Sequence, residues 1–100
     1  MTINEFQRLI ESIYLGKDRA RGMGGTFMWF SEEVGELARA LRDGDRDRLE
    51  GEFADVLAWL STLASMAGVD LEEVAAAKYS AGCPKCRRVP CGCQEQVRDT

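Results

Sequence analysis

The sequence predicts an all-α fold: a four-helix arrangement that oligomerises into a helical bundle and ends in a short cysteine-rich hook. Three observations support this prediction. Apolar residues recur three and four positions apart in several segments, no segment alternates in the manner of a strand, and capping residues stand at the expected helix ends. A chain of 100 residues makes one domain with a modest core, so an oligomer is expected.

The first half of the chain predicts two helices with a loop between them. The first helix is expected over residues 3–15, with Thr2 or Asn4 as its cap. The glycine-rich stretch 16–25 is expected to be a mobile basic loop. The second helix is expected over 26–42 and ends at the Gly44 turn. Its expected inward set is Phe27, Phe30, Val34, Leu37 and Leu41.

The second half predicts two further helices. A helix over 47–67 has the clearest apolar stripe, and Gly68 ends it. Asp70 caps the next helix, which reaches Tyr79. The stripe of the helix over 47–67 is Leu49, Phe53, Val56, Leu60, Leu63 and Ala67. The expected organisation is a helical domain at 1–80, a cysteine-rich hook at 81–93 and a polar tail at 94–100.

Composition limits the class of protein. Hydrophobic residues make up 45% of the chain, which is typical of a folded domain. The net charge of −4 gives no support for binding a nucleic-acid polymer or an anionic membrane. Neither a spanning apolar stretch nor a signal-peptide pattern is evident, so we expect a cytoplasmic protein.

Paired carboxylates on the two central helices form the candidate site. Glu33 and Glu36 lie three residues apart on one helix, and Glu52 and Asp55 lie three apart on the next. Side chains at this spacing share a helix face, and both pairs border the apolar stripe. If the two helices pack antiparallel, the four carboxylates repel one another unless a hard cation such as Mg²⁺ neutralises them. The alternative is an ordinary solvated acidic face.

The order of these motifs resembles that of the MazG-like nucleotide pyrophosphohydrolases. Trp29, EEVGEL at 32–37 and EFADVLAW at 52–59 carry the resemblance, because they follow the family's EExxE and ExxD signature. The resemblance covers about residues 5–80, which would make 1–80 a catalytic domain. It implies a Mg²⁺-dependent enzyme that cleaves a nucleoside triphosphate to the monophosphate and pyrophosphate, commonly removing surplus or non-standard nucleotides. It also implies a dimer or a dimer of dimers.

By position, the resemblance also implies roles for individual residues. The metal ligands would be Glu33, Glu36, Glu52 and Asp55. Glu32 would be a further ligand or would orient the attacking water. The chain has no histidine, which leaves general-base catalysis to a carboxylate or to water activated by the metal.

Basic and aromatic residues are candidates for substrate binding. Lys78, together with Lys17, Arg19 and Arg21 in the expected loop, could hold the outgoing phosphates. Ordinary surface charge is the competing interpretation for each of them. Trp29 and Trp59 could stack on a base, or they could belong to the core or to a dimer interface.

The four cysteines lie close together as CxxCxxxxCxC. They are Cys83, Cys86, Cys91 and Cys93. Four thiolates suit a tetrahedral structural Zn²⁺, and the alternative is reduced or reversibly oxidised thiols in a flexible tail. A different function also remains open, that of a non-enzymatic dimeric helical adaptor. Such an adaptor would use the zinc hook, with Arg87 and Arg88, to bind a protein or nucleic acid.

Overall fold

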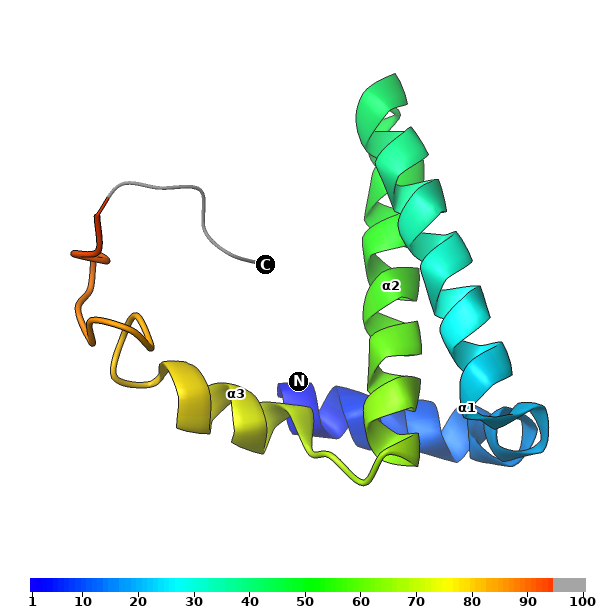
Figure 1. The fold of residues 1–100 in the computed structure, drawn as a ribbon. Helices are drawn as coiled ribbons and strands as arrows, with labels where there is room; N and C mark the ends of the chain where they lie inside the picture. The colour runs from blue at the N-terminus through cyan, green and yellow to red at the C-terminus, as the bar shows by residue number, and fades with distance from the viewer. Residues whose placement is uncertain (95–100) are drawn as a thin grey trace.

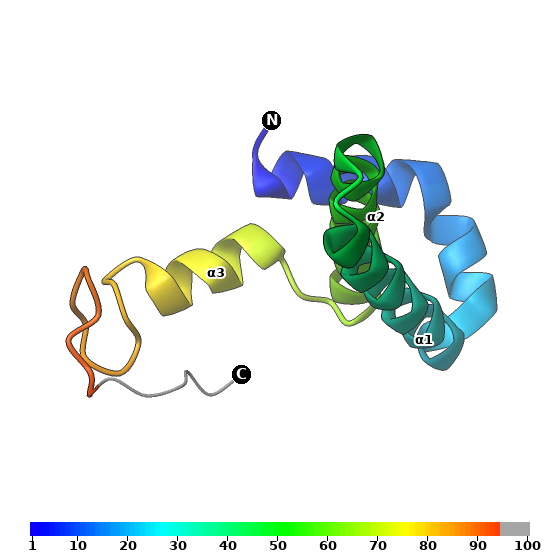
Figure 2. The ribbon, with the colours of Figure 1, turned by 90° about the horizontal axis from the view of Figure 1, so that it is seen from above.

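The computed structural model describes residues 1–94, which form three helices and no strand. α1 spans Ile3–Asp43, α2 spans Arg46–Met66 and α3 spans Leu71–Tyr79. A kink at Gly22 divides α1 into a first arm, residues 3–21, and a second arm, residues 23–43. The second arm runs beside α2, and the first arm crosses close to the end of this pair (Figure 1, Figure 2). α3 and the cysteine-rich segment extend away from the pair. The expected all-α class is therefore confirmed.

The segment 16–25 is helical, so the expectation of a mobile loop there is wrong. Within it, Gly22 has a non-helical backbone, with φ 85° and ψ 167°, and α1 is kinked at this residue. Glycine tolerates this conformation because it lacks a Cβ atom, whereas other residues are strained by it. The first two expected helices thus continue into each other across one residue. This is why the described chain has three helices where four were expected.

Capping residues set the helix ends largely as predicted. Thr2 and Glu5 form a reciprocal capping box at the start of α1. Gly44 ends α1 in the left-handed conformation, with φ 73°. Asp45 and Asp70 cap α2 and α3, and each accepts a hydrogen bond from the backbone amide of the third residue of its helix. α2 begins one residue earlier than the sequence predicts.

The single chain has a small and unusually polar interior. Its buried hydrophobic residues are Ile10, Ala40 and Ala64, and its largest fully buried side chains are Gln7, Thr26 and Ser61. Much of what this fold buries is therefore held by hydrogen bonds, because a polar group away from water needs a partner. The interior alone gives the chain a modest hydrophobic stabilisation.

Several residues of the expected inward stripes are exposed, which corrects that expectation for the single chain. Phe27 and Leu41 on α1 are each 55% exposed, and Phe53 on α2 is 53% exposed. Val34 and Leu60 continue these faces and are also exposed. Each of the two paired helices buries only the face that it turns toward the other. In the described residues no further element covers the outer apolar faces of the pair.

α3 is joined to α1 by polar contacts at one end. The backbone amide of Asn4 donates to Glu72 Oε1 at 3.0 Å. The side chains of Asn4 and Arg8 both contact the Asp70 carboxylate. Gln7 Oε1 accepts from the backbone amide of Leu71 at 2.9 Å. No residue of α3 is buried.

Among the described residues no single helix is long and apolar enough to cross a membrane. Of these described helices, only α2 and α3 taken together pass a test of length and composition, and they are bent by 96° relative to each other.

Candidate functional site

Three of the predicted carboxylates meet between α1 and α2. Glu33 comes from α1, Glu52 and Asp55 come from α2, and one oxygen of each lies within 4.8 Å of the others. We call these three residues the acidic seam. Glu33 Oε2 and Glu52 Oε2 are buried and have no hydrogen-bond partner. Buried carboxylate oxygens without a partner are costly, and a bound cation would satisfy them.

The surroundings of Glu33 in the acidic seam raise its pKa. Burial raises the pKa of Glu33 to about 7, and the negative charges of Glu52 and Asp55 add to this effect. A cation placed among the three groups would reverse the repulsion. Carboxylate oxygens converging from two helices are the donors that Mg²⁺ accepts, so the residues present fit this ion.

Glu36 and Glu32 lie outside the acidic seam. Glu36 forms ion pairs with Arg39 at 3.2 Å and with Arg48 of α2 at 3.5 Å. Glu32 is exposed on α1. The antiparallel pairing of the helices therefore brings together three of the four carboxylates that the spacing grouped. The fourth carboxylate, Glu36, lies closer to the turn between α1 and α2, where its charge is paired with that of Arg48.

A cavity of about 330 Å³ shares a wall with the acidic seam. It lies where the first arm of α1 faces α2, and Asp55 belongs to both features. The remaining lining residues are Ile10, Tyr14, Lys17, Asp18, Arg21, Ala58, Trp59 and Thr62. A volume of this size is typical of a small-molecule site. Its lining combines an aromatic face, a carboxylate and basic groups next to a candidate metal site.

Asp18 is a buried carboxylate in this cavity that sequence reasoning missed. Its side chain is almost completely buried, and it accepts hydrogen bonds from Arg21 Nη1 at 3.0 Å and from Thr62 Oγ1 at 3.1 Å. Arg21 also lies 5.0 Å from the centroid of the Trp59 ring. The signal was the three-residue spacing between Asp18 and Arg21. It has a meaning only if the segment is helical, and the glycines had favoured a loop.

The predicted substrate-binding residues fall into separate places. Lys17 and Trp59 line the cavity, and Trp29 stacks on Trp59 with centroids 6.4 Å apart and rings tilted by 10°. Arg19 is exposed outside the cavity lining. Lys78 lines a different cavity of about 80 Å³, where α3 meets the cysteine-rich segment.

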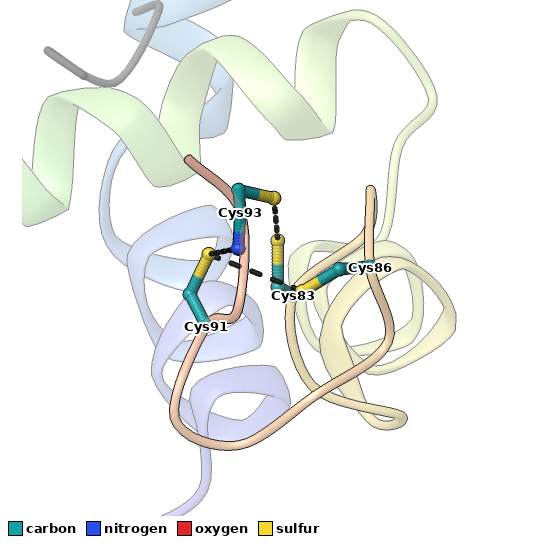
Figure 3. A group of neighbouring side chains, drawn as sticks. All are labelled: Cys83, Cys86, Cys91 and Cys93. Atoms are coloured by element: carbon teal, nitrogen blue, oxygen red, sulfur yellow. Dashed lines mark hydrogen bonds between the residues drawn. The ribbon is translucent and has the colours of Figure 1, made fainter. Parts of the chain in front are cut away.

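The four cysteines form a second cluster of candidate ligands (Figure 3). The sulfurs of Cys83 and Cys93 are 3.8 Å apart, and those of Cys86 and Cys91 are 4.0 Å apart. All four are free thiols. Hydrogen bonds from the backbone amides of Cys86 and Lys85 lower the pKa of Cys83 to about 6. Neighbouring thiols, Cys91 first, raise the pKa of Cys93 to about 12.

This chain was compared with protein-family models. Residues 25–87 match the model of the MazG nucleotide pyrophosphohydrolase domain. The matched region contains the whole acidic seam, both tryptophans and α3. A comparison with curated proteins finds no significant match.

Proposed function

Because the chain belongs to the MazG nucleotide pyrophosphohydrolase family, we propose that it is a Mg²⁺-dependent enzyme that converts a nucleoside triphosphate to its monophosphate and pyrophosphate. Membership in the family implies a hydrolase that acts on the phosphoric anhydride bonds of a nucleotide. The proposal adds the metal, the triphosphate substrate and the bond that is cleaved. We also propose that it acts in the cytoplasm on surplus or non-standard nucleotides, as members of this family commonly do.

The acidic seam is the observation that carries the proposal. Two buried oxygens without a partner, Glu33 Oε2 and Glu52 Oε2, lie on facing helices with Asp55 beside them. A solvated acidic face gives no reason for carboxylates to be half-buried against one another. When bound there, Mg²⁺ would neutralise phosphate charge and lower the pKa of a coordinated water.

The residues around the acidic seam supply the rest of the proposed site. Asp55 connects the seam to the cavity, so a polyphosphate held at the seam would leave the nucleoside beside Trp59. We assign Trp59 to stacking on the base, which requires the base to take the place of Arg21 or Trp29 on this ring. Lys17 offers a positive charge for phosphate oxygens. By the family resemblance, Glu32 would be a further metal ligand or would orient the attacking water; it is exposed and lies outside the acidic seam. Glu36 can join the metal ligands only if it gives up its contact with Arg48.

A homodimer or a dimer of dimers is the proposed assembly. Its support is the row of half-exposed apolar side chains on the outer faces of α1 and α2, among them Phe27, Leu41 and Phe53. Burying the exposed half of one such side chain contributes about 1 kcal/mol, so a second copy that covers several of them would add substantially to a small core. The net charge of −4 favours a small nucleotide held through a cation over a nucleic-acid polymer as ligand.

Nucleotide hydrolysis is tested directly with a panel of nucleoside triphosphates. The purified protein is incubated with each nucleotide, with and without Mg²⁺, and pyrophosphate and monophosphate are quantified. We expect Mg²⁺-dependent release of both products in equal amounts. Glu52→Gln and Asp55→Asn should each lower kcat by about 100-fold or more, because each removes a negative charge that would hold the Mg²⁺ ion against the reacting phosphates.

Glu50→Gln is the matched control for these variants. Glu50 lies on the same helix, but it is exposed and pairs with Arg46 at 3.2 Å. Its replacement should leave turnover unchanged. Absence of hydrolysis by the wild-type protein would favour the adaptor alternative. Release of inorganic phosphate with a nucleoside diphosphate would refute the proposed cleavage position.

A further inference from the structure

We propose that Cys83, Cys86, Cys91 and Cys93 bind one structural Zn²⁺ ion, and that this ion holds the segment 81–94 in its folded form. The proposal concerns a second metal site, remote from the acidic seam and independent of the proposed hydrolysis. The hook is the cysteine-rich part of this segment, residues 81–93.

The spacing of the sulfurs fits a single tetrahedral ion. Two sulfurs bound at about 2.3 Å to a tetrahedral Zn²⁺ lie about 3.8 Å apart. The measured separations are 3.8 Å for Cys83 and Cys93 and 4.0 Å for Cys86 and Cys91, and all four sulfurs lie within 4.8 Å of one another. Figure 3 shows the four side chains pointing toward a common centre. The sulfurs enclose room for one ion and not for a cluster with bridging sulfides.

The cysteines do not form disulfides in this arrangement. Bonded sulfurs lie about 2.05 Å apart, roughly half of the separations observed here. A pairwise oxidised hook would also leave no reason for two pairs to converge on one point. One ion with four thiolate ligands accounts for the whole group.

Backbone amides around the sulfurs give the ligand set a second layer of support. The Gly92 amide donates to Cys86 Sγ at 3.2 Å, and the Cys93 amide donates to Cys91 Sγ at 3.4 Å. Hydrogen bonds of this kind orient metal ligands and offset thiolate charge. Gly82 is required where the hook begins, because a Cβ atom there would lie 2.7 Å from the carbonyl oxygen of Arg88.

The hook has no core that could hold it without a metal. None of the residues 81–94 is buried, and Val89 is 84% exposed. The Cys83 amide donates to the Arg88 carbonyl at 3.0 Å, and the Arg87 amide donates to the Cys83 carbonyl at 2.6 Å. A few exposed backbone hydrogen bonds contribute little against chain entropy. The free energy of metal binding would therefore supply most of the stability of this segment.

Metal content is the first test. The full chain is purified without added metal and its zinc and iron are measured by mass spectrometry. We expect one zinc per chain, and loss of more than nine-tenths of it in both Cys86→Ser and Cys91→Ser. Lys85→Ala, between two of the ligands, is the control and should keep its zinc. Cobalt added to the chelated protein should produce the absorption of tetrahedral thiolate coordination.

Limited proteolysis tests the structural role without using enzymatic activity. Lys85, Arg87 and Arg88 are exposed trypsin sites within the hook. Removing zinc with a chelator should increase cleavage at these residues at least tenfold, and adding Zn²⁺ alone should restore protection. Cleavage after Arg46, at the start of α2, should not change.

Several results would overturn the proposal. These are stoichiometric iron, disulfide-bonded cysteines in the freshly purified protein, full zinc in both serine variants, or equal cleavage of the hook with and without zinc. Pyrophosphate release is measured separately on Cys86→Ser. The zinc proposal and the proposed hydrolysis can therefore fail independently.

Discussion

Replacing Glu33 by glutamine should stabilise the metal-free protein at alkaline pH and abolish its response to Mg²⁺. Glu33 faces Glu52 and Asp55, and its pKa is raised to about 7, first by burial and then by these charges. Between pH 4.5 and 7 the folded protein thus binds a proton at Glu33 that the unfolded chain has released. Stability therefore falls as the pH rises through this window. Glutamine carries no charge at any of these pH values, so the variant should not lose stability in this way.

The size of the effect follows from the pKa. A rise from 4.5 to about 7 corresponds to at most about 3 kcal/mol in the free energy of unfolding once Glu33 is ionised. Glu33 is only half-buried, and solvent screening reduces this to about 1–2 kcal/mol. For a domain of this length, that equals a difference in Tm of roughly 5–15 °C at pH 8. At pH 5 wild type and variant should differ little.

Thermal unfolding in a chelator, followed by circular dichroism from pH 5 to 8 at fixed protein concentration, measures this difference. Cys83, whose pKa is lowered to about 6, also titrates in this range. It is present in both proteins, so its contribution cancels in the comparison. Added Mg²⁺ should raise the Tm of the wild type increasingly toward high pH, because the ion competes with the proton. It should have little effect on Glu33→Gln.

Glu50→Gln, which neutralises an exposed carboxylate on α2, is the control and should follow the wild type at every pH. If Glu33→Gln and wild type show parallel Tm curves in chelator, the carboxylates of the acidic seam do not repel one another. If Mg²⁺ raises the Tm of both proteins equally, Glu33 does not bind the ion.

Three further predictions concern the cavity and the kink. Asp18→Ala should lower stability by about 2–4 kcal/mol in denaturant unfolding, because it removes the carboxylate that pairs with Arg21 and accepts from Thr62; an effect below that of Thr62→Val would contradict this. Gly22→Ala should lower stability by about 1–3 kcal/mol, since its backbone conformation suits only glycine. Gly16→Ala, in regular helix with open space around it, should be stabilising, and a similar loss in both would argue against a strained kink. Trp59→Ala should raise the KM for the nucleotide about tenfold or more through lost stacking, with Mg²⁺ affinity unchanged; an unchanged KM would remove Trp59 from the proposed site.

The sequence predicts the helix ends well because local chemistry determines them. Thr2, Gly44 and Asp70 act within one helical turn, and their roles need no knowledge of distant residues. The stretch around Gly22 shows the opposite case. Four glycines predicted a loop, yet packing of both arms of α1 against α2 keeps the other three helical and leaves the kink at one residue. Tertiary contacts override local propensity there.

The acidic seam is predictable in part. Helical spacing identifies which carboxylates share a face, and antiparallel packing brings Glu33 to Glu52 and Asp55. The ion pair between Glu36 and Arg48 depends on the register between the two helices, which spacing within one helix does not contain. Asp18 was missed for two reasons: its partner Arg21 lies in a segment where the glycines favoured a loop, and its partner Thr62 lies on another element.

Periodicity also leaves open what covers an apolar face. It correctly groups Phe27, Val34 and Leu41 on one side of a helix, but the described chain leaves that side exposed. The same pattern arises whether the face meets its own chain or another copy. A pattern in one sequence cannot distinguish these two cases, and an oligomeric-state measurement can.

The amide of Gln7 has a consequence for how this molecule can vary. Its Nε2 donates to Ser65 Oγ at 3.0 Å and to the Val69 carbonyl at 2.8 Å, while its Oε1 accepts from Leu71. Glutamate, lysine or methionine of similar length supplies only part of this pattern. Gln7, together with the contacts of Asn4 and Arg8 to Asp70 and Glu72, therefore sets the direction in which the chain leaves α2. Residues beyond Leu71 can diverge, lengthen or be exchanged without repacking the helical pair. A change at Gln7 would loosen the attachment of the start of α3 to α1.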